Sequence, residues 1–128
     1  IDPADAIGII RRAGGVAILA HPHLIDETIE KNGESISRAD YIERLIAAGL
    51  MGIEAAYPYD KTSYKGNQTN EEIRQSVLQT YGERLPVISG GSDYHADGKR
   101  GVQKPRVLGE GGISLEYFCA NPLLSALI

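Results

Sequence analysis

The chain has 128 residues, enough for one domain with a modest core, and its hydrophobic fraction of 42% is that of a soluble globular protein. No apolar run approaches the ~20 residues of a membrane-spanning helix, and a net charge of −4 argues against a general nucleic-acid-binding surface. The single cysteine, Cys119, excludes an intrachain disulfide. We therefore expect a cytoplasmic protein with no membrane partner, in which Cys119 is a small buried residue of a C-terminal helix.

The first segment predicts a helix followed by a strand. Asp2 is a favourable N-cap, Pro3 suits the first helical position, and Gly14-Gly15 ends the helix. The apolar run Val16–Ala20 then predicts a buried strand. The helix has one apolar face, made of Ala6, Ile9, Ile10 and Ala13.

The middle of the chain repeats this order after a polar segment. Residues 24–36 lack a clear period and contain an Asn-Gly turn signal, so we interpret them as a loop. Ser37 caps a predicted helix over residues 38–48, in a pattern that resembles a capping box. Gly52–Tyr57 is the next predicted strand.

The following residues predict a third unit of helix and strand. Residues 58–70 are polar and are interpreted as a loop, and Asn70 is the expected cap of a helix that ends at about Tyr81. Residues 86–89 form a short apolar run that predicts the third strand. Val107–Gly109 is a candidate for a further short strand.

The elements together predict one domain, residues 1–128, that ends in a helical tail over residues 113–128. Alternation of helix and strand indicates an α/β fold with parallel strands joined by right-handed crossovers. Three parallel strands leave a sheet edge and a sheet face poorly covered, so the chain is predicted to be part of an α/β barrel or layered sheet. The absence of an initiating methionine also favours a piece of a longer protein.

Two of the three histidines follow predicted strands. Asp93 and His95 come after the third strand and a Gly-Gly turn, and residues two apart in extended backbone point the same way, so they are candidate metal ligands or an acid/base pair. His21 follows the first strand, and α/β proteins hold their sites at such strand ends. The alternative is that Asp93 caps a turn, His95 lies on the surface and His21 simply ends its strand.

Four other residues are weaker candidates. His23 is a candidate ligand or substrate contact, although a proline redirects the chain before it. Glu54 lies in an apolar strand, where its charge is costly unless it is paired. In the functional interpretation it supports His21 or the metal site. In the alternative it points to solvent or pairs with an arginine. Lys104 or Arg106, in the basic loop after the third strand, would hold a phosphate; the alternative is a solvated loop.

Several of these segments together resemble the PHP (polymerase and histidinol phosphatase) superfamily. They are Ala20-His21-Pro22, Gly52-Ile53-Glu54 and Gly91-Ser92-Asp93-Tyr94-His95, followed by Lys104-Pro105 and Leu108-Gly109. The likeness covers residues 3–109 and is greatest to stand-alone metal-dependent phosphoesterases. It implies a distorted seven-stranded β/α (TIM-like) barrel with two or three divalent metals at the strand ends. The imidazole and carboxylate ligands themselves suit Zn, Mn or Fe. The likeness also implies that His21, Asp93 and His95 are metal ligands, and that Asp93 and His95 take part in catalysis.

The opening His-x-His pair of the family and its middle Glu and His ligands have no counterpart here, so the chain resembles the C-terminal part of such a barrel. We expect the complete protein to hydrolyse phosphate esters with a metal-activated water, on a phosphorylated small molecule or short nucleotide. We expect the isolated piece to be inactive without the N-terminal remainder of the same protein. Two alternatives stay open: a non-catalytic accessory or regulatory α/β domain that retains part of a metal site, and a non-phosphate metal hydrolase or isomerase.

Overall fold

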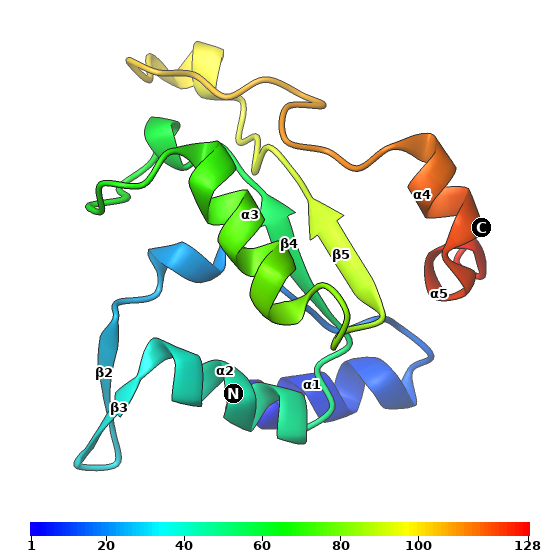
Figure 1. Ribbon diagram of the computed structural model, residues 1–128. Coiled ribbons are helices and arrows are strands. Elements are labelled where there is room, and N and C mark those ends of the chain that lie inside the picture. Colours follow the sequence, from blue (N-terminus) through cyan, green and yellow to red (C-terminus); the bar gives the residue numbers. More distant parts are fainter.

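Three parallel strands form the central sheet of the computed structural model, which describes residues 1–128. The strands β1 (Ile18–Leu19), β4 (Gly52–Ala56) and β5 (Val87–Gly90) lie in the order β1-β4-β5, so that β4 pairs with both neighbours (Figure 1). The predicted α/β class, the three strands and their parallel pairing are confirmed. A seven-stranded barrel remains a prediction.

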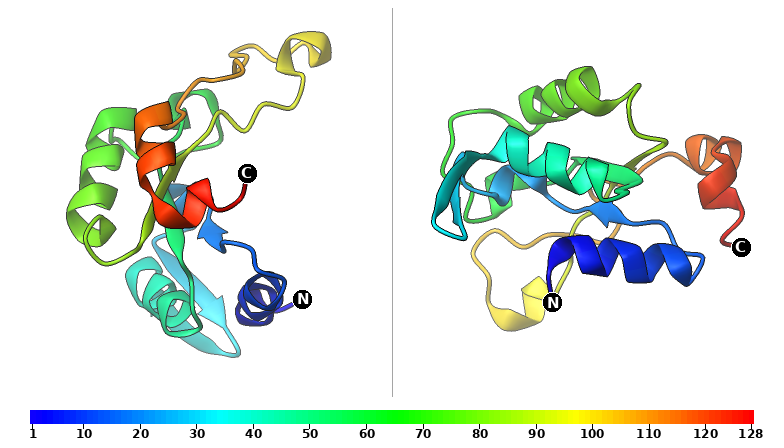
Figure 2. Two further views of the ribbon diagram at one scale, coloured as in Figure 1. Left: turned by 90° about the vertical axis from the view of Figure 1, so that its right-hand side faces the viewer. Right: turned by 90° about the horizontal axis from the view of Figure 1, so that it is seen from below.

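Helices alternate with these strands along the chain. The α-helices are α1 (Pro3–Arg12), α2 (Arg38–Ala47), α3 (Asn70–Tyr81), α4 (Leu115–Ala120) and α5 (Pro122–Ser125), and the 3-10 helices are η1 (Pro22–Leu24), η2 (Tyr59–Lys61) and η3 (Asp97–Arg100). α3 packs against β4, α1 contacts α2, and Figure 2 shows α2 and α3 on the same side of the sheet. No helix has both the length and the apolar character needed to span a bilayer.

Side chains cap the first three α-helices at their amino ends. Asp2 accepts a hydrogen bond from the backbone of Ala4 at 2.8 Å, as the sequence predicts for α1. Ser37 Oγ accepts from the backbone of Asp40 at the start of α2. The cap of α3 was expected at Asn70, but Thr69 has this role, because Thr69 and Glu72 satisfy each other's backbone N–H groups in a capping box.

The core lies between the sheet and the two helices that cover it. Its main cluster consists of Ile42, Ile53, Ala55, Tyr57, Tyr59, Ile73, Val77, Tyr81 and Leu85. A smaller cluster joins α1 to α2 through Ile7, which packs with Ala17, Leu45 and Leu50. The predicted apolar face of α1 is wrong in its main residues, since Ile9 and Ile10 are 49% and 40% exposed. α1 packs against α2 through Ile7 instead.

The polar segment that was interpreted as a loop contains a hairpin. β2 (Thr28–Lys31) and β3 (Glu34–Ser37) pair in antiparallel fashion, and Asn32 and Gly33 connect them with left-handed backbone, φ 53° and 76°. The hairpin extends away from the sheet (Figure 1), and Ile36 is its only buried residue. Each strand contains a single apolar residue, Ile29 or Ile36, so the apolar pattern is weak, and the Asn-Gly turn signal was the only indication of a hairpin in the sequence.

Two expectations for the last third of the chain are wrong. Val107–Gly109 forms no strand; Leu108 is 74% exposed and the segment ends in a turn in which the Glu110 backbone donates to Val107. Cys119 is exposed rather than buried, because α4 contacts the sheet through Tyr117, whose hydroxyl accepts from the Ile88 backbone at 2.8 Å.

Ile73 of α3 is fully buried in the main core cluster, and Ile9 of α1 is half-exposed. We expect Ile73→Ala to lower the free energy of unfolding by about 2–5 kcal/mol, because it leaves a cavity among packed side chains. Ile9→Ala, the matched control, should change it by less than about 0.5 kcal/mol. Urea denaturation followed by circular dichroism measures both; equal effects would contradict this placement of α3.

Candidate functional site at the carboxyl edge of the sheet

The carboxyl ends of the three parallel strands bring the predicted site residues to one edge of the sheet. His21 follows β1, Glu54 lies in β4, and Asp93 and His95 follow β5. Parallel strands place such residues side by side however far apart they are in sequence. Tyr57, which follows β4 directly, is a further residue of this edge that the sequence analysis did not identify.

Glu54 joins the ends of β1 and β4. Its Oε2 accepts a hydrogen bond of 2.6 Å from the backbone N–H of His21, a residue with left-handed backbone at φ 31°. Burial raises the pKa of Glu54, an effect that this hydrogen bond opposes. The end of β5 also approaches the carboxylate: a side chain at Gly91 would place its Cβ 3.0 Å from Glu54 Oε1. Glu54 thus contacts His21 through the backbone and not through the imidazole.

Tyr57 contacts both His21 and Asp93. The rings of Tyr57 and His21 are 5.2 Å apart between centroids, and the Tyr57 hydroxyl donates to Asp93 Oδ2 at 3.1 Å. Burial, helped by the Asp93 carboxylate, raises the pKa of Tyr57 to about 12. The phenol therefore stays protonated at neutral pH and donates to Asp93. The position of Tyr57 directly after the small residues at the end of β4 was its only signal in the sequence.

Asp93 is also held by a buried ionic network. Arg106 donates from Nη1 to Asp93 at 2.9 Å and from Nε to Asp97 at 2.8 Å. The Asp97 side chain is 1% exposed and also accepts from the backbone N–H groups of Arg106 and His95. These hydrogen bonds, chiefly those from Arg106, hold the pKa of Asp97 far below its ordinary value. Arg106 therefore binds two carboxylates of its own chain.

His95 lies beside Asp93 for a reason different from the predicted one. β5 ends at Gly90 and Asp93 has left-handed backbone at φ 52°, so the extended geometry assumed for residues 93 and 95 is wrong. A turn instead brings His95 Nδ1 to 2.6 Å from the carbonyl oxygen of Asp93. A carbonyl only accepts, so Nδ1 bears the proton of the neutral ring, and Nε2 is its acceptor nitrogen. The side chain is 55% exposed.

The predicted metal ligands do not assemble a metal site within this chain. Imidazole and carboxylate groups suit Zn, Mn or Fe, but no three His, Cys, Asp or Glu side chains form a group that could hold a metal ion. Tyr57 and Arg106 contact the Asp93 carboxylate instead. The residues present therefore do not fit a metal by themselves, and the ligand set His21, Asp93 and His95 stays a prediction.

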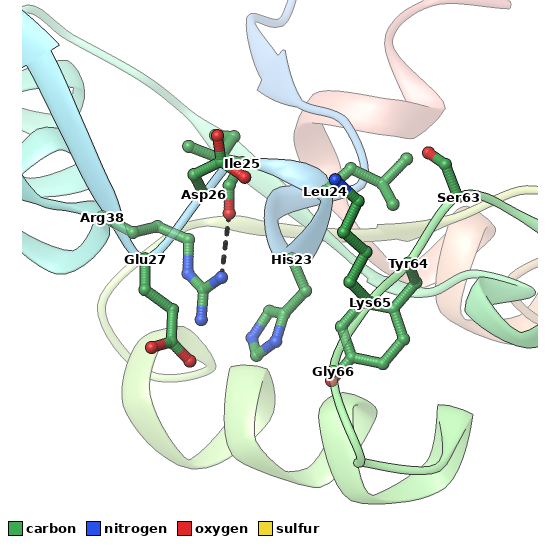
Figure 3. A pocket seen from close by; sticks show the side chains of 10 residues that line it. All are labelled: His23, Leu24, Ile25, Asp26, Glu27, Arg38, Ser63, Tyr64, Lys65 and Gly66. Carbon is green, nitrogen blue, oxygen red and sulfur yellow. Dashed lines mark hydrogen bonds between the residues drawn. The ribbon is translucent and has the colours of Figure 1, made fainter.

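The other candidate substrate contacts lie apart from this network. Lys104 is exposed and forms no ion pair. His23 lines a separate cavity of about 370 Å³, where its ring packs edge-on to Tyr59 with centroids 5.9 Å apart (Figure 3). Arg38 of α2 lines the same cavity and was also not identified from the sequence, because helix-capping patterns give no indication of contacts across the fold.

Two curated relatives match about three quarters of the chain. The 3',5'-nucleoside bisphosphate phosphatase of Chromobacterium violaceum is 36% identical over 101 residues, which are 76% of this chain and 29% of the relative. The phosphoribosyl 1,2-cyclic phosphate 1,2-diphosphodiesterase of Eggerthella lenta is 28% identical over 95 residues, 74% of this chain and 29% of the relative. The chain is thus similar to phosphoesterases and spans less than a third of their length. No protein-family model and no solved structure matches it.

Asp97 allows a test of the ionic network by pH. A carboxyl whose pKa is depressed in the fold stabilises it above the unfolded pKa of about 3.9, and this stabilisation is lost as the pH falls toward the folded value. We expect Asp97→Asn to lower the thermal unfolding midpoint at pH 7, and the difference from the wild type to shrink below about pH 4. Asp5→Asn, at an exposed position, is the control. A difference in unfolding midpoint between wild type and Asp97→Asn that grows as the pH falls would contradict the ionic network of Asp97 and Arg106.

Proposed function

We propose that this chain is part of a larger metal-dependent phosphoesterase of the PHP type, built on a β/α barrel, that hydrolyses a phosphorylated small molecule or short nucleotide. The observation behind the proposal is the similarity of about three quarters of the chain to two phosphoesterases. Because the chain spans 29% of each relative, the remaining ligands and strands are proposed to come from another part of the same protein.

The edge of the sheet supports this assignment. His21, Asp93 and His95 are the proposed ligands from this chain for a divalent metal, which would activate water and neutralise charge on the phosphate. Glu54 holds the backbone of His21, and Tyr57 and Arg106 hold the Asp93 carboxylate. Proposed ligands that are held in this way keep their orientation when ligands from another part of the protein complete the site.

The cations near the edge have different proposed roles. Arg106 is bound by Asp93 and Asp97, so we propose that it positions Asp93. Lys104 is exposed and unpaired, and we propose it as the cation that contacts the substrate phosphate. The Asp93–Arg106 pair also favours a second candidate function, an accessory domain in which an arginine replaces the metal beside Asp93.

We expect Asp93→Asn in the complete protein to lower kcat for an aryl phosphate ester by about 100-fold or more, because it removes the charge of a proposed ligand. Lys104→Ala should mainly raise KM, and Lys99→Ala, at an exposed position of η3, should change neither constant. The isolated chain should be inactive. Steady-state kinetics measure these effects; unchanged turnover in Asp93→Asn would favour the accessory domain.

Metal titration tests the incomplete site directly. Calorimetry with Mn²⁺ should show that the 128-residue chain binds at most one ion, and much more weakly than the complete protein, because no three ligands converge in the chain. The double variant His21→Ala, Asp93→Ala should remove the residual binding. Tight binding of two or three ions by the chain alone would show that its own residues complete the site.

A further inference from the structure

The cavity beside His23 is formed by two connections that leave the carboxyl edge of the sheet. Its walls come from residues 23–27 after β1, from residues 63–66 after β4, and from Arg38 at the start of α2. Figure 3 shows the His23 ring between the guanidinium of Arg38 and the ring of Tyr64. A volume of about 370 Å³ lies within the range of about 300–1,000 Å³ that is usual for small-molecule sites.

The inner wall of the cavity has hydrogen-bonding groups that nothing in the chain uses. Arg38 is held in place by one bond, from Nη1 to the carbonyl of Ile25 at 2.9 Å, and it forms no ion pair, unlike Arg44 on the same helix. Its Nε and Nη2 make no hydrogen bond. The ring nitrogens of His23 likewise have no partner in the chain, although the residue is half-buried. The free N–H groups of Arg38 and the ring nitrogens of His23 therefore line the same cavity.

One part of the lining is flat or apolar. Tyr64 is half-buried and packs against Tyr59 with ring centroids 5.4 Å apart, which fixes the plane of its ring. Leu24 and Ile25 add aliphatic surface. Aromatic and aliphatic walls with a few polar groups are typical of sites for planar heteroaromatic rings.

The distribution of charge argues against a phosphate in this cavity. Arg38 is the one half-buried cation, while Lys65 is exposed. The carboxylates of Asp26 and Glu27 also line the cavity, from exposed positions. A dianion would meet two like charges there, whereas the edge of a nucleobase presents both donors and acceptors and can use a guanidinium and a carboxylate together.

A continuous series of ring contacts links the cavity to the sheet edge. The ring of His21 contacts Tyr57, Tyr57 contacts Tyr59 at 4.8 Å between centroids, and Tyr59 contacts both His23 and Tyr64. The Tyr59 hydroxyl also accepts from the His23 backbone at 3.2 Å. Tyr57 and Tyr59 are themselves buried, so the packed core fixes where the cavity lies relative to the sheet edge.

We propose that this cavity binds the nucleobase of a phosphorylated nucleoside, whose phosphate lies at the sheet edge, an inference that rests on the proposed phosphoesterase function for the phosphate end only. Tyr64 stacks on the base, and Arg38 and His23 hydrogen-bond to its edge. The proposed substrate class is thus narrowed from phosphorylated small molecules and short nucleotides to phosphorylated compounds that contain a nucleoside.

The test separates base from phosphate by using probes that contain only one of them. The ¹⁵N-labelled 128-residue chain is titrated with adenosine and with uridine, which lack phosphate, and with ribose 5-phosphate, which lacks a base. We expect at least one nucleoside to shift the backbone amide signals of residues 23–27 and 63–66, and ribose 5-phosphate to leave them unchanged. The same shifts with ribose 5-phosphate would show an anion site and overturn the proposal, as would the absence of shifts with both nucleosides.

Variants identify the groups responsible. Tyr64→Leu should weaken nucleoside binding by about fivefold or more, since base–aromatic stacking contributes about 1–3 kcal/mol. Arg38→Met should weaken it by a similar factor, because it removes the hydrogen-bond donors to the edge of the base. Tyr64→Phe keeps the ring and should bind nearly as the wild type, and Arg44→Met is the matched surface control on α2. Arg38→Lys replaces Arg38→Met if the latter fails to give a folded spectrum. Equal affinity in Tyr64→Leu and the wild type would overturn the role of the cavity.

The complete protein distinguishes this inference from the proposed function. If it hydrolyses an aryl phosphate but shows the same kcat/KM for a nucleoside monophosphate with wild-type and Tyr64→Leu proteins, the cavity proposal alone fails. If it hydrolyses neither ester while the isolated chain still binds nucleosides in the cavity, the phosphoesterase proposal alone fails.

Discussion

The hydrogen bond from the His21 backbone to Glu54 organises the edge of this sheet. It joins the ends of β1 and β4 at 2.6 Å and gives a partner to a half-buried carboxylate. It also holds a left-handed histidine, a conformation that a residue with a side chain adopts at some cost in free energy. Without this bond, the charge of Glu54 would be left in a poorly solvated position, and the chain would leave β1 in another direction. The place of His21, and of the η1 turn after it, depends on this contact.

The end of β5 is organised by charge. Asp97 and Asp93 share the guanidinium of Arg106, and the loop between these residues closes around the ion pair. A buried ion pair adds little to the stability of a fold compared with apolar residues of similar size, but the removal of one partner is costly. Such a network therefore specifies one conformation of the loop more than it raises the stability of the fold. Here it fixes the carboxylate of Asp93 at the sheet edge, together with the Tyr57 hydroxyl. The Asp93 carboxylate at the sheet edge is therefore held by two groups of its own chain.

The sheet edge and the cavity beside His23 are fixed relative to each other because the same two tyrosines pack against residues of both. Tyr57 and Tyr59 are almost fully buried, and their rings contact each other as well as the two histidines on either side. Aromatic packing of this kind is rigid, so the spacing between the two regions is set by the core and not by a flexible loop. The two buried tyrosines thus set the distance between the sheet edge, where the phosphate is proposed to bind, and the cavity, where the base is proposed to bind.

Local patterns in the sequence determined the α/β class, the three parallel strands, the N-cap of α1 at Asp2 and the position of His21 and Asp93 after strands, because short apolar runs and capping residues act over a few positions. The hairpin over residues 28–37 was missed because each strand contains only one apolar residue, although the Asn-Gly pair at its turn is a hairpin signal. Tyr57, Asp97 and Arg38 acquire their roles from partners 9 to 36 positions away or from a cavity wall, and no local pattern records such contacts. Only the tertiary structure decided that Arg106 faces two carboxylates, that Glu54 holds a backbone, and that His23 lies in a cavity of its own, because burial and charge pairing follow from packing and not from neighbouring residues in the chain.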